Sequence, residues 1–244
     1  MDIGNCSPDP ALGKSVNIDF SQGPSNLFAA QGKPTYNSDG ASFTIAGPGE
    51  SPLLISNFYI MFGRVEFVMK ASPGAGIVSS AVLQSDDLDE IDWEWLGGDN
   101  AQVQSNYFGK GQTTTYNRGA FHASPNNQGA FHTYTIDWTS DHVVWQIDGV
   151  TIRTLEPSNA QGQYPQTPMR IKIGTWAGGD PTVNAPGTVR KYYITFLLQV
   201  SLWLTVNACR MGRRSYELRG WAIRYAGQVH RSDRLFDRHI VSVF

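Results

Sequence analysis

The sequence predicts a single all-β domain made of many short strands. Of the 244 residues, 25 are Gly, 13 are Pro and 12% are aromatic, a composition that suits short strands joined by tight turns. No long segment shows the helical period of about 3.6 residues, and no internal repeat of roughly 20–50 residues is visible. Several segments alternate in polarity instead, as half-buried strands do. A chain of this length can bury a sizeable core, so one large domain is expected.

The first clear strand signal is residues 65–70. Here Val65, Phe67 and Met69 alternate with Glu66, Val68 and Lys70. Successive side chains of a strand point to opposite faces, so this pattern predicts one buried and one solvent-facing side. Further along, residues 133–139 and 142–147 are expected to form an antiparallel pair. The dipeptide Asp148-Gly149 then follows directly, which is a strong signal for a tight hairpin into the next strand.

Residues 89–95, which read DEIDWEW, are the most informative segment of the chain. As a strand, they would place three acids on one face, and Ile91, Trp93 and Trp95 on the other. The acids are Glu90, Asp92 and Glu94. Like charges in a row repel and raise one another's pKa, while the apolar side would anchor the strand in a core. This combination is typical of an active site.

Glycoside cleavage is a reaction that uses such a row. One carboxylate attacks the sugar carbon, and a second carboxylic acid protonates the departing oxygen. Residues four apart on a strand have Cα atoms roughly 13 Å apart, and inward-leaning side chains can close this to the ~5–5.5 Å of a retaining enzyme. We therefore expect Glu90 to be the nucleophile, Glu94 the acid and then base, and Asp92 a helper between them. Spacing alone does not fix the order of the roles.

Two other interpretations of the acidic segment compete with this one. A calcium site is the first, because Asp86, Asp87 and Asp89 crowd beside the acid row. An EF-hand-type loop needs alternate ligands, a Gly turn and a distant Glu, and that spacing is absent. A merely solvated acidic strand is the second. We expect no metal and no cofactor, since nothing in the sequence supports nucleotide, flavin or haem binding.

Candidate sugar-binding residues lie on the expected neighbouring strands. Trp138 and Trp145 sit in strand-like runs and are expected in the core. Trp176 is followed by small residues that leave its ring uncovered, and it shares a strand face with Lys172. A ring beside a polar group suits a sugar, whose apolar face stacks while its hydroxyls need partners. Further candidates, on the strand after the acids, are Gln104 and Tyr107.

Several separated motifs resemble one known family. Residues 89–98, DEIDWEWLGG, look like the signature of glycoside hydrolase family 16. Their continuation over residues 99–108, together with FHTYTIDW at 131–138 and GTWAGGD at 174–180, resembles the Crh family of fungal cell-wall transglycosylases, which join chitin to β-glucan. The resemblance runs from about residue 6 to residue 189, and the motifs occur in the family's order.

The resemblance implies a concanavalin-like β-jelly-roll, a sandwich of two curved antiparallel sheets whose concave face binds sugar. It implies a retaining transglycosylase that cleaves chitin or β-glucan and transfers the glycosyl unit to a β-glucan acceptor. It gives the three acids the roles stated above. It also assigns substrate contacts to Glu94, Lys172, Trp176 and Thr188. Two alternatives stay open, a hydrolytic endo-β-1,3/1,4-glucanase and an inactive carbohydrate-binding jelly-roll.

The partner implied is a polysaccharide, with no nucleic acid, no membrane span and a monomeric protein. The resemblance places the protein outside the cell, at the fungal wall. Residues 1–6 are too short and too acidic for a signal peptide, and no GPI-type signal is visible at the other end. Cys6 and Cys209 are too few for a disulfide framework.

Residues 190–244 depart from the family in composition. They contain no Pro and 3 Gly, with nine Arg and one Lys against three acids. We therefore expect a catalytic domain over residues 1–189, incomplete at its C-terminus, followed by an atypical basic tail. Three explanations compete: a translation artefact from a retained intron or frame error, a basic arm for anionic partners, and a divergent terminus. Residues 192–206 are apolar, shorter than the ~20 residues that span a bilayer, and could supply a strand or short helix.

Overall fold

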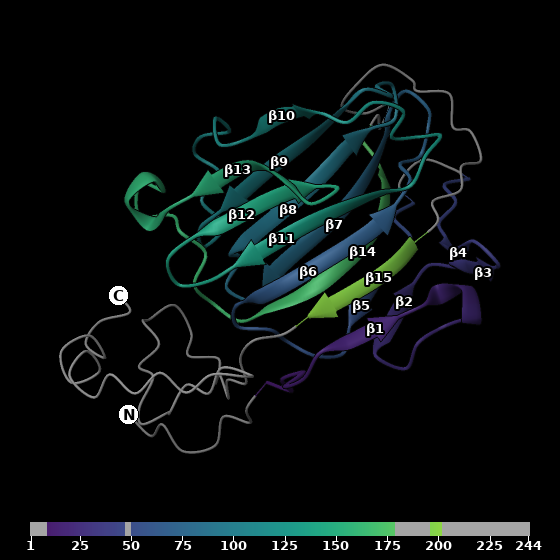
Figure 1. Cartoon of the computed structure of the whole chain (residues 1–244), viewed down its shortest axis with the longest axis horizontal. Coiled ribbons are helices and arrows are strands. Elements are labelled where there is room, and N and C mark those ends of the chain that lie inside the picture. Colours follow the sequence, from purple (N-terminus) through teal and green to yellow (C-terminus); the bar gives the residue numbers. More distant parts are fainter. Residues whose placement is uncertain (1–8, 47–49, 179–195, 202–244) are drawn as a thin grey trace.

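The computed structural model describes residues 9–46, 50–178 and 196–201. These residues form two antiparallel sheets that lie face to face (Figure 1). The only helical elements among the described residues are two short 3₁₀ turns, η1 (Phe20–Gln22) and η2 (Pro157–Asn159). The all-β sandwich expected from the sequence is therefore confirmed.

The first sheet, here called the β6 sheet, has eight strands. Their order is β13 (Val150–Leu155), β12 (Val143–Ile147), β11 (His132–Trp138), β6 (Gly63–Met69), β15 (Phe196–Ser201), β4 (Gly40–Ser42) and β3 (Thr35–Asn37), and β1 (Val16–Ile18) also pairs with β15. In β6 the side chains alternate between buried and partly exposed, as predicted, with Val65, Phe67 and Met69 fully buried.

The second sheet, here called the β8 sheet, has seven strands and carries the acids. Their order is β10 (Ala120–Ala123), β9 (Gln102–Phe108), β8 (Glu90–Leu96), β7 (Ile77–Ser85), β14 (Met169–Ala177), β5 (Leu53–Ser56) and β2 (Phe28–Gln31). One face of this sheet packs on the β6 sheet. Its other face, called the outer face below, points away from the core.

The hairpin predicted at Asp148-Gly149 joins β12 to β13. Asp148 has φ 49° and Gly149 has φ 79°, both in the left-handed region that a two-residue hairpin turn requires. The Asp148 carboxylate also accepts a hydrogen bond of 2.8 Å from the backbone N–H of Thr133, at the start of β11. The turn is thus tied to the neighbouring strand, and the expected pairing of β11 with β12 is present.

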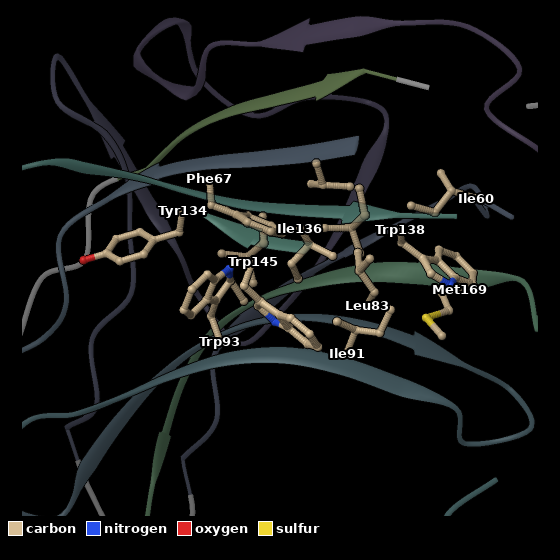
Figure 2. Close-up of a cluster of buried hydrophobic side chains, with 14 of the residues drawn as sticks. Ile60, Phe67, Leu83, Ile91, Trp93, Tyr134, Ile136, Trp138, Trp145 and Met169 are labelled. Carbon is tan, nitrogen blue, oxygen red and sulfur yellow. The ribbon is translucent and has the colours of Figure 1, made fainter. Parts of the chain in front are cut away.

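Large aromatic side chains fill the space between the two sheets (Figure 2). Four tryptophans are fully buried there: Trp93, Trp95, Trp138 and Trp145. Trp138 and Trp145 come from the β6 sheet, so their predicted place in the core is confirmed. Because Trp93 and Trp95 project inward from β8, they anchor the acid-bearing strand from behind.

The strand β15 comes from the part of the sequence that departs from the family composition. It pairs with β6 on one side, with Leu197 opposite Val68, and with β1 and β4 on the other. Residues 196–201 therefore complete the β6 sheet and cover what would be an open edge of β6. This is a strand of the kind considered for residues 192–206. The rest of the expected tail lies outside the described residues, as do Cys6 and Cys209.

Candidate active site

The three acids lie together on the outer face of β8. Ile91, Trp93 and Trp95 are fully buried on the inner face, while Glu90 and Glu94 are partly exposed on the other side. Cross-strand register fixes their neighbours. On β9, Phe108, Asn106 and Gln104 lie opposite Glu90, Asp92 and Glu94 respectively. On β7, the corresponding residues are Gln84, Val82 and Ser80.

A buried carboxylate fixes the start of β8. Asp89 accepts a hydrogen bond of 2.8 Å from the backbone N–H of Lys110 at one oxygen. Its other oxygen accepts bonds of 2.8 Å from the N–H of Gln166 and 2.7 Å from the Thr167 hydroxyl. Asp89 therefore ties two loops to the start of β8, at the residue that precedes Glu90.

Burial and mutual repulsion shift the protonation of two of the acids. The pKa of Asp92 is raised well above its usual value, first by burial and then by the charges of Glu94 and Glu90, with which it competes for ionisation. The pKa of Glu94 is also raised, first by burial and then by the charge of Glu90, while a hydrogen bond from Trp176 opposes the shift. Asp92 and Glu94 therefore hold their protons more strongly than ordinary carboxyl groups do, and a raised pKa is the property that a general acid requires.

Lys172 lies on β14, two strands from the acids. Its ammonium donates a hydrogen bond of 2.5 Å to the side-chain oxygen of Gln84 on β7. The amide nitrogen of Gln84 in turn donates to the carboxylate of Glu90. Sequence reasoning selected Lys172 but missed Gln84, because only the register of β7 against β8 shows that Gln84 faces Glu90.

Trp176 lies near the end of β14, on the same face as Lys172. Its side chain is 40% exposed, which leaves a ring face open on the acid side of the sheet. It also contributes the hydrogen bond that acts on Glu94. The structure thus brings both Trp176 and Lys172 to the acid row from the β14 side.

The two candidate sugar-binding residues on β9 lie on opposite faces of the sheet. Gln104 lies directly opposite Glu94 on the outer face, and its amide makes no hydrogen bond to any described residue. Tyr107 lies opposite Ile91 instead, and only 5% of it is exposed, on the core side beneath the Arg153 guanidinium. A one-residue difference in strand position reverses the face. Tyr107 is therefore not brought to the acids. Thr188 lies outside the described residues.

Within residues 9–46, 50–178 and 196–201, no cluster of three or more His, Cys, Asp or Glu side chains could hold a metal ion. No helix within these ranges is long and apolar enough to cross a membrane.

Comparison with known proteins agrees with this geometry. The model for glycosyl hydrolases family 16 matches residues 22–195. Crh-like protein 4 of Aspergillus fumigatus is 62% identical over 186 residues, which are 76% of this chain and 41% of that protein. Congo red hypersensitive protein 1 of Saccharomyces cerevisiae is 52% identical over 187 residues, 75% of this chain and 36% of that protein. The chain thus spans less than half the length of these two relatives.

Solved structures share the fold. A Crh5 transglycosylase in complex with NAG superimposes with a TM-score of 0.77 at 44% identity, covering 81% of this chain and 88% of that one. A Bacillus licheniformis β-glucanase superimposes with a TM-score of 0.67 at 24% identity, over 78% of this chain and 99% of that one, and shows the fold alone. The expected jelly-roll is confirmed. The chain belongs to glycosyl hydrolases family 16, among its Crh-like proteins.

Proposed function

We propose that this chain carries the catalytic domain of a retaining transglycosylase that cleaves a cell-wall β-linked polysaccharide, chitin or β-glucan, and transfers the glycosyl unit to a β-glucan acceptor. The observation that carries the proposal is the row of Glu90, Asp92 and Glu94 on one face of β8, with the pKa of two of them raised. The similarity to a Crh5 transglycosylase supports transfer as the reaction.

In the first step, the Glu90 carboxylate attacks the anomeric carbon of the donor. Glu94, held protonated by burial and by the charge of Glu90, gives its proton to the departing glycosidic oxygen. The bond between that oxygen and the anomeric carbon breaks, and an ester between the sugar and Glu90 forms. The cleaved part of the donor leaves with a free hydroxyl.

In the second step, Glu94 is a carboxylate and acts as the base. It removes the proton from a hydroxyl of the acceptor, whose oxygen attacks the anomeric carbon and releases Glu90. Two inversions at the same carbon retain the β-linkage. Because the pKa of Asp92 is raised far, its proton is available to hydrogen-bond Glu90, which lowers the repulsion inside the row.

Sugar binding is assigned to the side chains around the row. Trp176 offers an open ring beside Glu94, and on the other side Gln104 offers an amide that makes no hydrogen bond to a described residue. Lys172 adds a cation on the same face. Such a mixture of ring face and polar groups fits a pyranose. Substrates of this kind lie in the fungal wall, so the proposal places the protein outside the cell, and we expect it to be monomeric.

The test is an incubation of the protein with chito-oligomers and a fluorescently labelled β-1,3-glucan oligomer, followed by chromatography of the products. Transfer predicts labelled hybrids longer than the starting acceptor, absent with the Glu90→Gln variant. Short unlabelled products alone would show a hydrolytic glucanase or chitinase. Oligomer binding without any product from the wild type would show a carbohydrate-binding jelly-roll. Either of the last two outcomes contradicts the proposal.

A further inference from the structure

A line of side chains crosses the outer face of the β8 sheet and ends at an exposed aromatic ring. Phe121 on β10 lies opposite Gln104 on β9, and Gln104 lies opposite Glu94 on β8. Adjacent strands are about 4.8 Å apart, so the backbone at Phe121 lies roughly 10 Å from that of Glu94. A short oligosaccharide laid across the strands reaches from one to the other.

Phe121 and Gln104 are both without partners in the described structure. Phe121 is 53% exposed, and its ring contacts no other ring or cation among the described residues. The Gln104 amide lies over Gly119, where its carbon is 3.1 Å from the place a Cβ would occupy, so Gly119 leaves room for it beside Phe121. An open ring face next to a free amide offers both kinds of contact that a sugar residue needs.

The acid row has an exposed aromatic ring on each side. Trp176 on β14 and Phe121 on β10 are each two strands from β8, in opposite directions. A single exposed Phe is common on protein surfaces and needs no explanation by itself. Phe121, however, lies in one cross-strand line with Gln104 and Glu94. On the other side of the acids, Trp176 lies two residues along β14 from Gly174, the residue in line with Glu94 through Ser80. This placement of two exposed rings on either side of the acids is what points to a ligand.

We propose that Phe121, with Gln104 beside it, is a second sugar-binding platform for one residue of a β-linked hexopyranose chain. It rests on the proposed function, because it extends the same site. A chain that crosses the strands contacts both platforms at once, with its scissile bond over the acids. Oligomers too short to span this distance contact the acids and one platform only.

Binding in the Glu90→Gln background tests the platform separately from turnover. Calorimetry with chito-oligomers and β-1,3-glucan oligomers, from dimer to hexamer, would compare Phe121→Ala, Phe121→Trp and a control, Phe131→Ala. Phe131 is a similarly exposed Phe, at 42%, immediately before β11 of the other sheet. We expect Phe121→Ala to raise Kd for the longer oligomers about three- to tenfold, as for one lost aromatic contact. Phe121→Trp should restore it, and Phe131→Ala should match the parent.

Equal Kd values for Phe121→Ala and its parent at every length would overturn the platform, even if wild-type transfer occurs as proposed. An equal loss for dimers and hexamers would also overturn it, because a general structural defect does not depend on oligomer length. A length-dependent loss supports the platform even if the wild type proves not to transfer. The two proposals therefore fail independently.

A different observation, the hydrogen-bonded relay over three strands, carries a second inference. The ammonium of Lys172 has only donors, so the Gln84 oxygen, 2.5 Å away, must face it. The NH₂ of the same amide then has to face Glu90, to which it donates. Lys172 thus fixes the orientation of Gln84, and Gln84 holds one oxygen of the Glu90 carboxylate in place.

We infer that Gln84 is a positioning residue for the nucleophile and that Lys172 acts on Glu90 through it. A donated hydrogen bond favours the ionised, attacking form of a carboxylate and restricts its rotation. These two hydrogen bonds would therefore orient the Glu90 carboxylate before any sugar binds. Gln84 acts through the Glu90 carboxylate, to which its amide donates.

Three variants test the relay: Gln84→Leu, Lys172→Met and the double variant, with Arg170→Met as control. Arg170 lies opposite Gln84, yet its guanidinium stacks over Tyr59 at 4.6 Å, so the control removes an equal charge without touching the relay. We expect Gln84→Leu to slow formation of the covalent intermediate about 10–100-fold, the worth of one hydrogen bond to a charged group. The acid limb of its pH–rate profile should move to higher pH. Lys172→Met should move the acid limb in the same direction. The double variant should be only slightly slower than Gln84→Leu alone.

A merely structural role for Gln84 predicts a lower melting temperature with an unmoved pH profile, and that result would overturn the inference. Additive losses in the double variant would overturn it as well, since they would show that Lys172 acts apart from Gln84. An equal shift of the pH profile in Arg170→Met would show a general charge effect instead of the relay.

Discussion

The indole nitrogen of Trp145 donates a hydrogen bond of 3.3 Å to the backbone carbonyl of Asp92. The bond connects β12 of one sheet with the centre of the acid-bearing strand in the other. It comes from a fully buried ring (Figure 2) that also lies under the Arg153 guanidinium, 4.8 Å from its centroid. The position of the three acids along β8 thus depends on the core of the sandwich.

Trp145→Phe should separate packing from this hydrogen bond. The smaller ring keeps much of the core contact but leaves a buried carbonyl without its side-chain partner, so we expect a loss of about 1–3 kcal/mol in the free energy of unfolding. Trp145→Ala should lose about 3–5 kcal/mol, because a large cavity remains. Urea denaturation followed by fluorescence measures both. An unchanged free energy of unfolding in Trp145→Phe would show that the hydrogen bond from the indole N–H contributes nothing to stability.

Asp89→Ala should lower the free energy of unfolding markedly, because the Asp89 carboxylate is buried. Two backbone N–H groups and the Thr167 hydroxyl lose their acceptor together, at about 1–3 kcal/mol for each buried group. Asp89→Asn keeps one oxygen and should lose less. The matched control is Asp39→Ala, in the exposed turn between β3 and β4. Similar urea midpoints for Asp89→Ala and Asp39→Ala would contradict the anchoring role.

Asp92 should make the fold less stable as pH rises. Its pKa is raised in the folded state, so between the ordinary carboxyl value and the raised value the folded protein holds the proton that the unfolded chain has lost. The stabilisation is present below the unfolded pKa and is lost as pH rises through the folded pKa. Asp92→Asn removes this dependence, and we expect a melting temperature about 2–4 °C higher at neutral pH. The opposite result would be a lower melting temperature for Asp92→Asn at neutral pH, with the same dependence of melting temperature on pH as the wild type. It would show that the Asp92 carboxyl group does not cause the loss of stability at higher pH.

Glu94 should determine the basic limb of the activity profile. Its pKa is raised, so the proton needed for the first step is lost only as pH passes that higher value. Glu94→Gln should abolish this limb and slow donors with poor leaving groups about 10²–10⁴-fold. Donors with activated leaving groups should be less affected, and azide should recover part of their rate. An unchanged basic limb in Glu94→Gln would show that another group is the general acid.

The sequence alone predicted the features that depend on the alternation of polar and apolar residues within one strand. The pattern DEIDWEW separates acids from apolar residues within one strand, so the shared face of Glu90, Asp92 and Glu94 could be inferred without any partner strand. The same holds for the buried face of β6 and for the Asp148-Gly149 turn. In each case the physical cause, which is the period-two geometry of a strand or the left-handed backbone of a turn, depends only on residues adjacent in the sequence.

What depends on register between distant strands could not be predicted. Gln84 precedes the acids by several residues and looks like any polar strand residue until β7 is aligned on β8. Tyr107 was expected to contact substrate, but its pairing with Ile91 turns it to the core. Phe121 could not be related to Glu94 from the sequence, because the two residues are connected only through Gln104 on a third strand.

The most direct measurement is the mass of the reaction intermediate. The Glu94→Gln protein would be mixed with a donor that carries an activated leaving group, quenched in acid and digested for peptide mapping. Without an active base the second step is slow, so one glycosyl unit should accumulate on the peptide containing Glu90, at the Glu90 carboxylate itself. An adduct on another residue, or donor turnover by this variant and the wild type with no adduct at any time, would contradict Glu90 as the nucleophile.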